Sequence, residues 1–280
     1  MSDTVVSSRM EYVGVAGERV PSLGLGTCEL TDHACVRTVR RALSMGFRHV
    51  DAAQAEGNER EIGRALAESG VDREECFLTT KLRPANLRYE DVHRSTRESV
   101  ERLGVEYLDV LSIHRPSLTV PLSETLRAMG ELREEGLVRH LGVCNFTRGG
   151  LRRARRLSPV PILTDRVQYH PYSVHEELLA YCRETGVLLT ACCPLANGRI
   201  ADDDRLAAIG DRYGKTATQV ALRWLLQQGM VVVATAEDEG QLAENLAVFD
   251  FHLDETEMAA VPEPSLVRTG ADWVRGRFWA

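Results

Sequence analysis

The sequence predicts a protein of the α/β class, folded as a single (β/α)8 TIM barrel. Three observations lead to this prediction. The 280 residues suit one large hydrophobic core better than two small ones. Short apolar runs alternate with amphipathic windows along the chain. The apolar runs are nearly continuous, as expected for parallel strands that are covered on both faces. We therefore expect one domain that spans residues 1–280, without an internal linker.

The predicted strands are runs of β-branched and other apolar residues that follow one another at regular intervals. They are Ser22–Cys28, Phe47–Ala52, Cys76–Leu82, Tyr107–His114, Arg139–Asn145, Leu163–Tyr169, Val187–Cys193 and Met230–Ala234. The windows between them carry apolar residues at helical spacing, and several end before a glycine. These predicted helices are Thr31–Ser44, Asn58–Ser69, Asn86–Leu103, Leu122–Glu135, Arg148–Leu157, His175–Thr185, Asp203–Tyr213, Ala217–Gln228 and Gly240–Val248.

Two segments at the ends of the chain do not belong to this alternation. Residues Arg9–Val20 are typical of an N-terminal β-hairpin that turns at Ala16-Gly17, and we expect it to plug the floor of the barrel. The C-terminal tail, Glu263–Ala280, contains Trp273. We expect the tail to fold back near the barrel mouth, where Trp273 would contact the substrate.

Composition and charge argue against several kinds of partner. The net charge of −7 and the pI near 5.7 give no electrostatic support for binding nucleic acid or an anionic membrane. No apolar run approaches the roughly 20 residues that span a bilayer, and the N-terminus lacks the features of a signal peptide. Seven cysteines without scaffold-like spacing indicate reduced thiols. We therefore expect a cytoplasmic protein with a small-molecule substrate.

Candidate site residues lie where the predicted strands end, because barrel enzymes build their active sites from these positions. Acid, base, amide and thiol groups recur there: Asp51, Glu56, Lys81, His114, Asn145, Arg166, Cys192 and Cys193. Carboxylate, ammonium and imidazole groups that meet in one pocket shift each other's pKa values, which suits proton transfer. Asp51 and Lys81 could equally form a buried ion pair that braces the barrel.

Ordered motifs at these positions carry a family resemblance. They are Leu23-Gly24-Leu25-Gly26-Thr27, Gly46-Phe47-Arg48-His49-Val50-Asp51, Gly57-Asn58-Glu59, Thr80-Lys81-Leu82, Ile113-His114-Arg115-Pro116, Gly142-Val143-Cys144-Asn145-Phe146, His170-Pro171-Tyr172, Glu177-Leu178-Leu179-Ala180-Tyr181-Cys182, Pro194-Leu195 and Glu244-Asn245. The chain resembles an aldo-keto reductase from end to end. The resemblance implies carbonyl reduction by NADPH with an Asp, Tyr, Lys, His tetrad, and it favours a monomer or weak homodimer. Asp51, Lys81 and His114 match three of these positions, whereas Glu56 stands at the position of the tyrosine.

The positions that bind NADPH in this family also differ here. Asn145 matches one half of the Ser-Asn pair that holds the nicotinamide carboxamide, and Arg166 occupies the position of its glutamine partner. Cys192 replaces the tyrosine that stacks on the nicotinamide ring. Glu244 and Asn245 match the adenine-contacting positions. We interpret these last two and Asn145 as vestigial, and we expect no cofactor and no metal.

The cations that hold the adenosine 2′-phosphate in this family are missing as well. Its Ile-Pro-Lys-Ser segment reads Val233-Ala234-Thr235-Ala236, and its arginine position is Gln241. The residues that follow the segment are acidic: Glu237, Asp238 and Glu239. Loss of these cations alone would indicate an enzyme that binds NADH in place of NADPH.

Taken together, the differences favour a cofactor-independent enzyme of non-redox acid–base chemistry on a small carbonyl-containing metabolite. Beside Lys81, Glu56 should be ionised, since a nearby cation lowers a carboxyl pKa. Glu56 would then act as a general base in an isomerisation, a dehydration or elimination, or a cyclisation. Arg166 would bind a substrate carboxylate, or would form a salt bridge with Asp165 or another local acid. The rest of the substrate pocket would be lined by Asn145, Cys192, Cys28 and Trp273.

Two alternatives from other classes remain. The first is an NAD(P)H-dependent carbonyl reductase with relaxed cofactor binding, in which burial raises the pKa of Glu56 strongly enough to keep it protonated. The second is a non-catalytic binding protein. The thiols near the strand ends could be nucleophilic, but packing of the barrel interior is the commoner role of buried cysteines.

Overall fold

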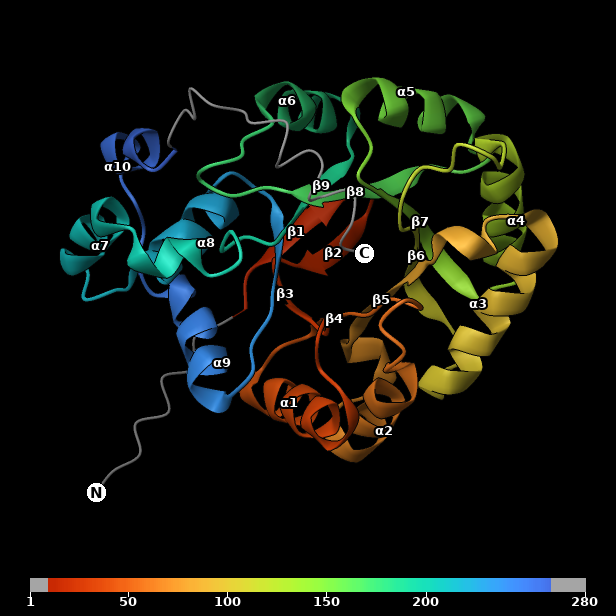
Figure 1. Cartoon of the computed structure of the whole chain (residues 1–280), viewed down its shortest axis with the longest axis horizontal. Helices are drawn as coiled ribbons and strands as arrows, with labels where there is room; N and C mark the ends of the chain where they lie inside the picture. Colours follow the sequence, from red (N-terminus) through yellow and green to blue (C-terminus); the bar gives the residue numbers. More distant parts are fainter. Residues whose placement is uncertain (1–9, 263–280) are drawn as a thin grey trace.

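The protein is a closed barrel of parallel strands with helices around it (Figure 1). This computed structural model describes residues 10–262, so Trp273 and the predicted C-terminal tail lie outside the described residues. Within these residues, eight strands close in the order β10-β3-β4-β5-β6-β7-β8-β9. Each neighbouring pair is parallel. The predicted (β/α)8 fold is confirmed.

The strands and helices alternate along the chain after an initial hairpin. The strands are β1 Tyr12–Val15, β2 Glu18–Pro21, β3 Leu23–Gly26, β4 His49–Asp51, β5 Phe77–Leu82, β6 Leu108–Ile113, β7 Val138–Cys144, β8 Ile162–Gln168, β9 Leu188–Cys192 and β10 Val231–Ala234. The α-helices are α1 Asp32–Met45, α2 Glu59–Ser69, α3 Tyr89–Leu103, α4 Leu122–Glu134, α5 Arg148–Leu157, α6 Glu176–Thr185, α7 Asp204–Asp211, α8 Ala217–Gln227, α9 Glu239–Leu246 and α10 Glu255–Ala260. Short 3₁₀ turns cover Arg73–Glu75, Pro84–Asn86, Arg199–Asp202 and Ala247–Phe249.

One helix of the described chain, α10, is absent from the sequence prediction. It has only six residues, which is too short for an apolar period to stand out. Its first turn is held by a capping box, in which Asp254 accepts from the backbone of Glu257 and Glu257 accepts in return. The sequence does contain a signal for this helix, because an acidic N-cap residue followed three residues later by glutamate is typical of a helix N-terminus.

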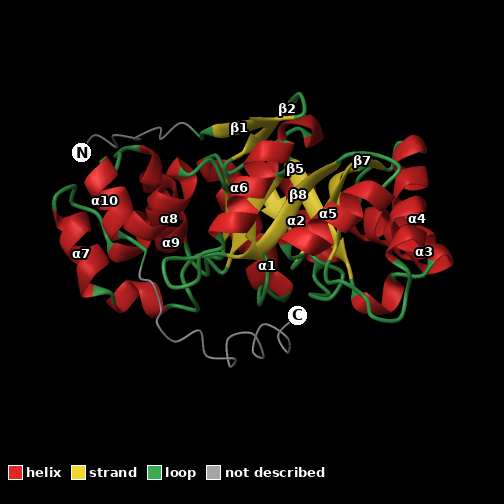
Figure 2. Cartoon of the chain, turned by 90° about the horizontal axis from the view of Figure 1, so that it is seen from above, coloured by secondary structure: helices red, strands yellow, loops and turns green. Residues whose placement is uncertain are grey.

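The hairpin of β1 and β2 closes the N-terminal end of the barrel, as predicted. Ala16 and Gly17 both have positive φ, 49° and 86°, as a two-residue type I′ turn requires. Figure 2 shows the hairpin at one end of the barrel. There Val20 joins a buried apolar cluster with strand residues from inside the barrel: Val110, Leu163, Leu188 and Val231.

Alternate residues of each strand face opposite layers, and this alternation positions the site. In β4, Val50 packs in the main apolar core, whereas His49 and Asp51 line a cavity inside the barrel. In β5, Leu78 joins the same core and Thr79 lines the same cavity. The helices therefore cover an apolar outer surface of the barrel, and the polar groups are directed inward. No helix in residues 10–262 is both long enough and apolar enough to cross a membrane.

Close contact between α2 and α3 gives a first test. A Cβ added to Gly63 in α2 would lie 2.5 Å from the carbonyl oxygen of Leu103, which is backbone and cannot rotate away. We expect Gly63→Ala to destabilise the protein by about 1–3 kcal/mol through overpacking. Urea unfolding midpoints measure this change.

The control is Gly149→Ala in the exposed first turn of α5, where the nearest atom to an added Cβ is 4.0 Å away. We expect this variant to be neutral or more stable by up to about 1 kcal/mol. Equal midpoints for Gly63→Ala and the parent protein would contradict the packing described for α2 and α3.

Candidate active site

A buried ion pair lies at the centre of the carboxyl-terminal end of the barrel. Lys81 Nζ lies 2.7 Å from Asp51 Oδ2 and donates a second hydrogen bond, of 2.8 Å, to the carbonyl oxygen of Ala52. Thr79 donates from Oγ1 to the other carboxylate oxygen of Asp51 at 2.5 Å. Lys81 is 1% exposed and Asp51 is 4% exposed. The adjacent parallel strands β4 and β5 bring both side chains into the barrel interior.

Arg166 approaches the same carboxylate from β8. Its Nε lies 3.1 Å from Asp51 Oδ2, although without the alignment of a hydrogen bond. Of the two predicted roles of Arg166, this contact matches the salt bridge with a local acid, and the acid is Asp51. Asp165 lies on the opposite face of the strand, where its Oδ1 faces the backbone nitrogen of Phe146. Asp51 therefore faces two cations, Lys81 and Arg166.

This arrangement fixes the charge of Asp51. Burial disfavours the ionised carboxylate, but Lys81 and then Arg166 outweigh burial and hold the pKa of Asp51 well below its ordinary value. Asp51 is thus a carboxylate at neutral pH.

Glu56 occupies the turn between β4 and α2, and its pKa is shifted in the direction opposite to the sequence expectation. Its Oε2 lies 2.6 Å from Thr27 Oγ1, which is itself 3.3 Å from the carbonyl oxygen of Asp51. Burial raises the pKa of Glu56 above its ordinary value of 4.5, and the opposing effect of Lys81 is smaller. Lys81 therefore acts in the expected direction, but the expected net shift is wrong because the effect of burial is larger.

The turn that carries Glu56 is anchored by its neighbour. The side-chain nitrogen of Asn58 donates to the carbonyl oxygens of Thr27 and Leu30, each at 2.9 Å. Gly57 provides the left-handed backbone, with φ of 72°, that the turn requires. The loop after β3 and the loop after β4 are therefore tied together around Glu56.

His114 and Asn145 follow β6 and β7 at the same end of the barrel. His114 is 8% exposed, and its Nδ1 has no hydrogen-bond partner among the described residues. Burial, followed by the charge of Lys81, lowers the pKa of His114 to about 4, so the imidazole is neutral at pH 7. Asn145 is exposed, has a φ of 64°, and donates from its amide to the carbonyl oxygen of His114 at 3.1 Å.

The predicted thiols divide into exposed and buried ones. Cys28 is exposed after β3, whereas Cys144 and Cys192 are buried at the ends of β7 and β9. Cys193 is exposed with a φ of 49°. Within residues 10–262, no group of three or more His, Cys, Asp or Glu side chains is arranged to hold a metal ion.

The two residues predicted at the adenine-contacting positions lie in α9, beside β10. Asn245 is buried and donates to the carbonyl oxygen of Thr235 at 3.4 Å, and Glu244 accepts from Thr216 Oγ1 at 2.5 Å. The helix starts at an Asp238 cap that accepts from the backbone of Gln241. Glu237, Asp238 and Glu239 are all exposed at this end of α9.

Sequence reasoning missed three polar residues at the site: Thr27, which contacts Glu56; Thr79, which contacts Asp51; and His49, which lies inside the barrel. Thr27 could have been found because it directly follows an apolar strand. Neither ring nitrogen of His49 makes a well-aligned hydrogen bond within the described residues. Burial lowers the pKa of His49 to about 4.

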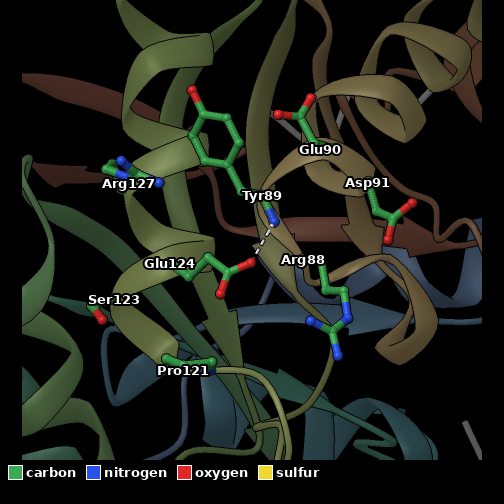
Figure 3. Close-up of a pocket in the computed structure, with 8 residues that line it drawn as sticks. All are labelled: Arg88, Tyr89, Glu90, Asp91, Pro121, Ser123, Glu124 and Arg127. Atoms are coloured by element: carbon green, nitrogen blue, oxygen red, sulfur yellow. Dashed lines mark hydrogen bonds between the residues drawn. The ribbon is translucent and has the colours of Figure 1, made fainter.

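A separate hollow lies on the outside of the barrel, at the first turns of α3 and α4 (Figure 3). Its volume is about 670 Å³. It is lined by Arg88, Tyr89, Glu90, Asp91, Pro121, Ser123, Glu124 and Arg127. Within it, the side chain of Glu124 accepts from the backbone of Tyr89 at 2.9 Å, and Arg127 lies over the Tyr89 ring. It contains none of the strand-end residues, so we do not regard it as the active site.

The chain is similar in sequence and fold to known aldo-keto reductases. The sequence profile of the Aldo/keto reductase family matches residues 22–264. An aldo-keto reductase of Mycolicibacterium paratuberculosis is 39% identical over 258 residues, which cover 91% of this chain and 90% of the relative. The crystal structure of a putative 2,5-diketo-D-gluconic acid reductase B has a TM-score of 0.89 and 42% identity, and the match covers 94% of this chain and 96% of that one. A Bombyx mori aldo-keto reductase, solved in complex with NADP, has a TM-score of 0.84 and 29% identity, with 90% and 92% covered.

These findings overturn two expectations from the sequence. The cofactor-independent isomerase, lyase or cyclase is wrong, because the relatives along nearly the whole chain are reductases. The expectation of no cofactor is wrong as well, because the comparison includes a family structure with NADP bound.

The buried histidines make stability depend on pH. The pKa values of His49 and His114 are lowered from 6.5 to about 4 in the folded protein, so the unfolded chain binds more protons between these limits. The free energy of unfolding should therefore fall as the pH drops from about 6.5 towards 4, by up to about 1.4 kcal/mol per pH unit for each histidine. Urea unfolding at a series of pH values measures this slope.

His114→Asn should give a shallower slope between pH 6.5 and about 4 than the parent protein. Identical slopes for the two proteins would show that His114 is not buried as a neutral group.

Proposed function

The chain belongs to the aldo/keto reductase family, and from this premise we propose that it reduces the carbonyl group of a small molecule with NADH or NADPH. One observation carries the proposal. Glu56, whose pKa is raised by burial, interacts electrostatically with both members of the Asp51–Lys81 ion pair, and the neutral His114 follows β6 at the same end of the barrel. A carboxylic acid at this position can donate the proton that carbonyl reduction needs.

The residues of the barrel mouth fit a nicotinamide dinucleotide. Two buried donors, His114 Nδ1 and Arg166 Nε, lack an aligned partner among the described residues, and Asn145 is exposed beside them. Asn145 would hold the carboxamide, and Glu244 and Asn245 would contact the adenine. When bound, the dinucleotide supplies a hydride to the carbonyl carbon.

Glu56 would deliver the proton to the carbonyl oxygen. Thr27 has one hydroxyl proton and two acceptors within reach, Glu56 Oε2 at 2.6 Å and the carbonyl oxygen of Asp51 at 3.3 Å. If Glu56 is protonated, it can donate to Thr27 while Thr27 donates to Asp51, and every acceptor is satisfied. The same hydrogen-bond chain would hold Glu56 in position before the proton leaves.

Lys81 and His114 would stabilise the charge that develops on the substrate oxygen. Asp51 and the Ala52 carbonyl hold the Lys81 ammonium in place, so little reorganisation is needed during the reaction. A neutral imidazole can donate one hydrogen bond to the carbonyl oxygen without competing with Glu56 as the acid. Arg166 adds a second cation that faces Asp51.

The acidic end of α9 favours NADH over NADPH. Glu237, Asp238 and Glu239 are exposed there, and Glu239 pairs with Arg41. An extra phosphate at this end would face like charges, which disfavour binding. We expect tryptophan fluorescence titrations to show tighter binding of NADH than of NADPH.

In the same titrations, Glu237→Lys should improve NADPH binding by about 1 kcal/mol, roughly fivefold in Kd, and leave NADH binding unchanged. Equal gains for both dinucleotides would mean that the substitution acts on general charge and not on the phosphate. Tighter NADPH binding by the unaltered protein would contradict the assignment of this end of α9.

Glu56→Gln tests the proton donor. We expect kcat for carbonyl reduction to fall by roughly 10²–10⁴-fold, while dinucleotide affinity stays the same. In the unaltered enzyme, reduction should be lost as the pH rises through the pKa of Glu56, which lies above 4.5, because the acid form is required. Consumption of reduced dinucleotide with a panel of aldehydes, ketones and keto acids measures both effects.

Two further variants make this test specific. Glu56→Tyr places the family's own acid at the position, so the loss of activity should move to higher pH, towards the ordinary phenol pKa of about 10. Glu29→Gln, an exposed glutamate near the same mouth, should keep the parent pH profile. An undiminished kcat in Glu56→Gln would rule Glu56 out as the donor.

A further inference from the structure

Two adjacent cysteines end β9 at the barrel mouth and play no part in the proposed reduction. Cys192 is 6% exposed and pairs in register with Gln168 of β8. Cys193 is exposed, and its backbone lies in the left-handed region, with a φ of 49°, which residues other than glycine rarely adopt. The turn is secured on both sides, because Tyr169 N donates to the carbonyl oxygen of Cys192 and Ala196 N donates to that of Cys193.

The charges around Cys192 favour a thiolate. Asp51 is the carboxylate that faces both Lys81 and Arg166, so the cluster carries a surplus of positive charge if Glu56 is neutral. Arg166 and Cys192 belong to neighbouring strands and act on each other electrostatically. Interaction with the Cys193 thiol, together with Arg166, lowers the pKa of the Cys192 thiol below its ordinary value. The same interaction raises the pKa of Cys193, which favours its protonated form.

We propose that Cys192 and Cys193 form a peroxide-sensitive dithiol, which a hydroperoxide converts into a disulfide between the two adjacent residues. Cys192 is the attacking thiolate and Cys193 is the resolving thiol. Among the seven cysteines, only these two are adjacent in the chain, and they lie at the end of a strand that neighbours the strand of Arg166.

The chemistry balances in two steps. The Cys192 thiolate attacks the terminal oxygen of the hydroperoxide, so that an S–O bond forms, the O–O bond breaks, and the departing oxygen leaves as alcohol or water after protonation. The Cys193 sulfur then attacks the sulfenic sulfur of Cys192. The S–S bond forms, the S–O bond breaks, and the hydroxide leaves as water with the thiol proton. Two thiols are oxidised and the hydroperoxide is reduced by two electrons.

The geometry predicts that this disulfide is easily reversed. Consecutive Cα atoms are about 3.8 Å apart, below the range of about 4.4–6.8 Å that unstrained disulfides span. Strained disulfides have more oxidising potentials and are the labile ones. Oxidation would also remove the thiolate beside Arg166. We infer that the reductase loses activity in the oxidised form, and this part alone rests on the proposed function.

Mass spectrometry tests the thiol chemistry without any assay of turnover. The native protein is treated with hydrogen peroxide, alkylated, digested and mapped. We expect the loss of two of the seven titratable thiols, and a peptide lighter by two hydrogen atoms that contains both Cys192 and Cys193. A dithiol reductant should restore both thiols. A disulfide that joins Cys28 to Cys193, or oxidation that leaves Cys192 untouched, would overturn the proposal.

Variants separate the two thiols. Cys193→Ser should stop at a sulfenic acid on Cys192 that dimedone traps, and further peroxide should carry it to the sulfinic acid. Cys192→Ser should lose rapid oxidation altogether. Cys28→Ser, the matched control at the same mouth, should still form the Cys192–Cys193 disulfide. Unchanged disulfide formation in Cys192→Ser would overturn the assignment.

The activity of the oxidised protein is a separate readout. If the disulfide forms and reduction of carbonyls stops until a dithiol is added, the inferred loss of activity in the oxidised form is supported. If the disulfide forms but no carbonyl is reduced in either state, the proposed function fails while the dithiol stands. If the disulfide forms and activity is unchanged, the inferred loss of activity is wrong.

Discussion

The buried pair of Asp51 and Lys81 is the interaction on which the rest of the site depends. Removing two charges from water is costly, and their attraction offsets the cost only if other hydrogen bonds complete the geometry. Here Thr79 supplies a donor to Asp51, and the carbonyl oxygen of Ala52 accepts from Lys81. The strands β4 and β5 set these positions through their parallel register. The pair is therefore built into the barrel and does not depend on a flexible loop.

Because Lys81 is engaged in this way, burial dominates the acidity of its neighbours. The raised pKa of Glu56 and the lowered pKa of His114 both have burial as their largest cause, with Lys81 second. Burial raises the pKa of an acid and lowers the pKa of a base, and in both cases it favours the neutral form. The site thus combines a fixed ion pair with an acid and a base whose neutral forms are favoured by burial, which suits proton transfer to a carbonyl oxygen.

Arg166 changes the balance of charge at the barrel mouth. It stands at the position of a neutral glutamine in the family that the chain resembles, and here it faces Asp51. The added cation also lies next to the thiol pair at the end of β9. The charge of Arg166 therefore acts both on Glu56 and on Cys192, and it lowers the pKa of each.

Much of the fold, and the meeting of several polar residues at one end of the barrel, could be predicted from the sequence. The alternation of apolar runs and amphipathic windows gave the barrel, because local periodicity survives in a linear pattern. The ends of the runs identified Asp51, Lys81 and His114, because parallel strands bring their carboxyl ends together. The short α10 and the 3₁₀ turns were not predicted, and the bounds of each predicted barrel strand differ from the observed ones by one or two residues at one or both ends.

The direction of the pKa shift of Glu56 could not be predicted in the same way. Sequence shows that Glu56 and Lys81 are close, but not whether the lysine is already satisfied by Asp51 and Ala52. The contact of Glu56 with Thr27, 29 residues away in the chain, is likewise visible only in the folded barrel. The residue types and their order determined which groups meet. The tertiary structure decided their charges, because the pKa of a group depends on how much water its neighbours exclude and which partners they already have.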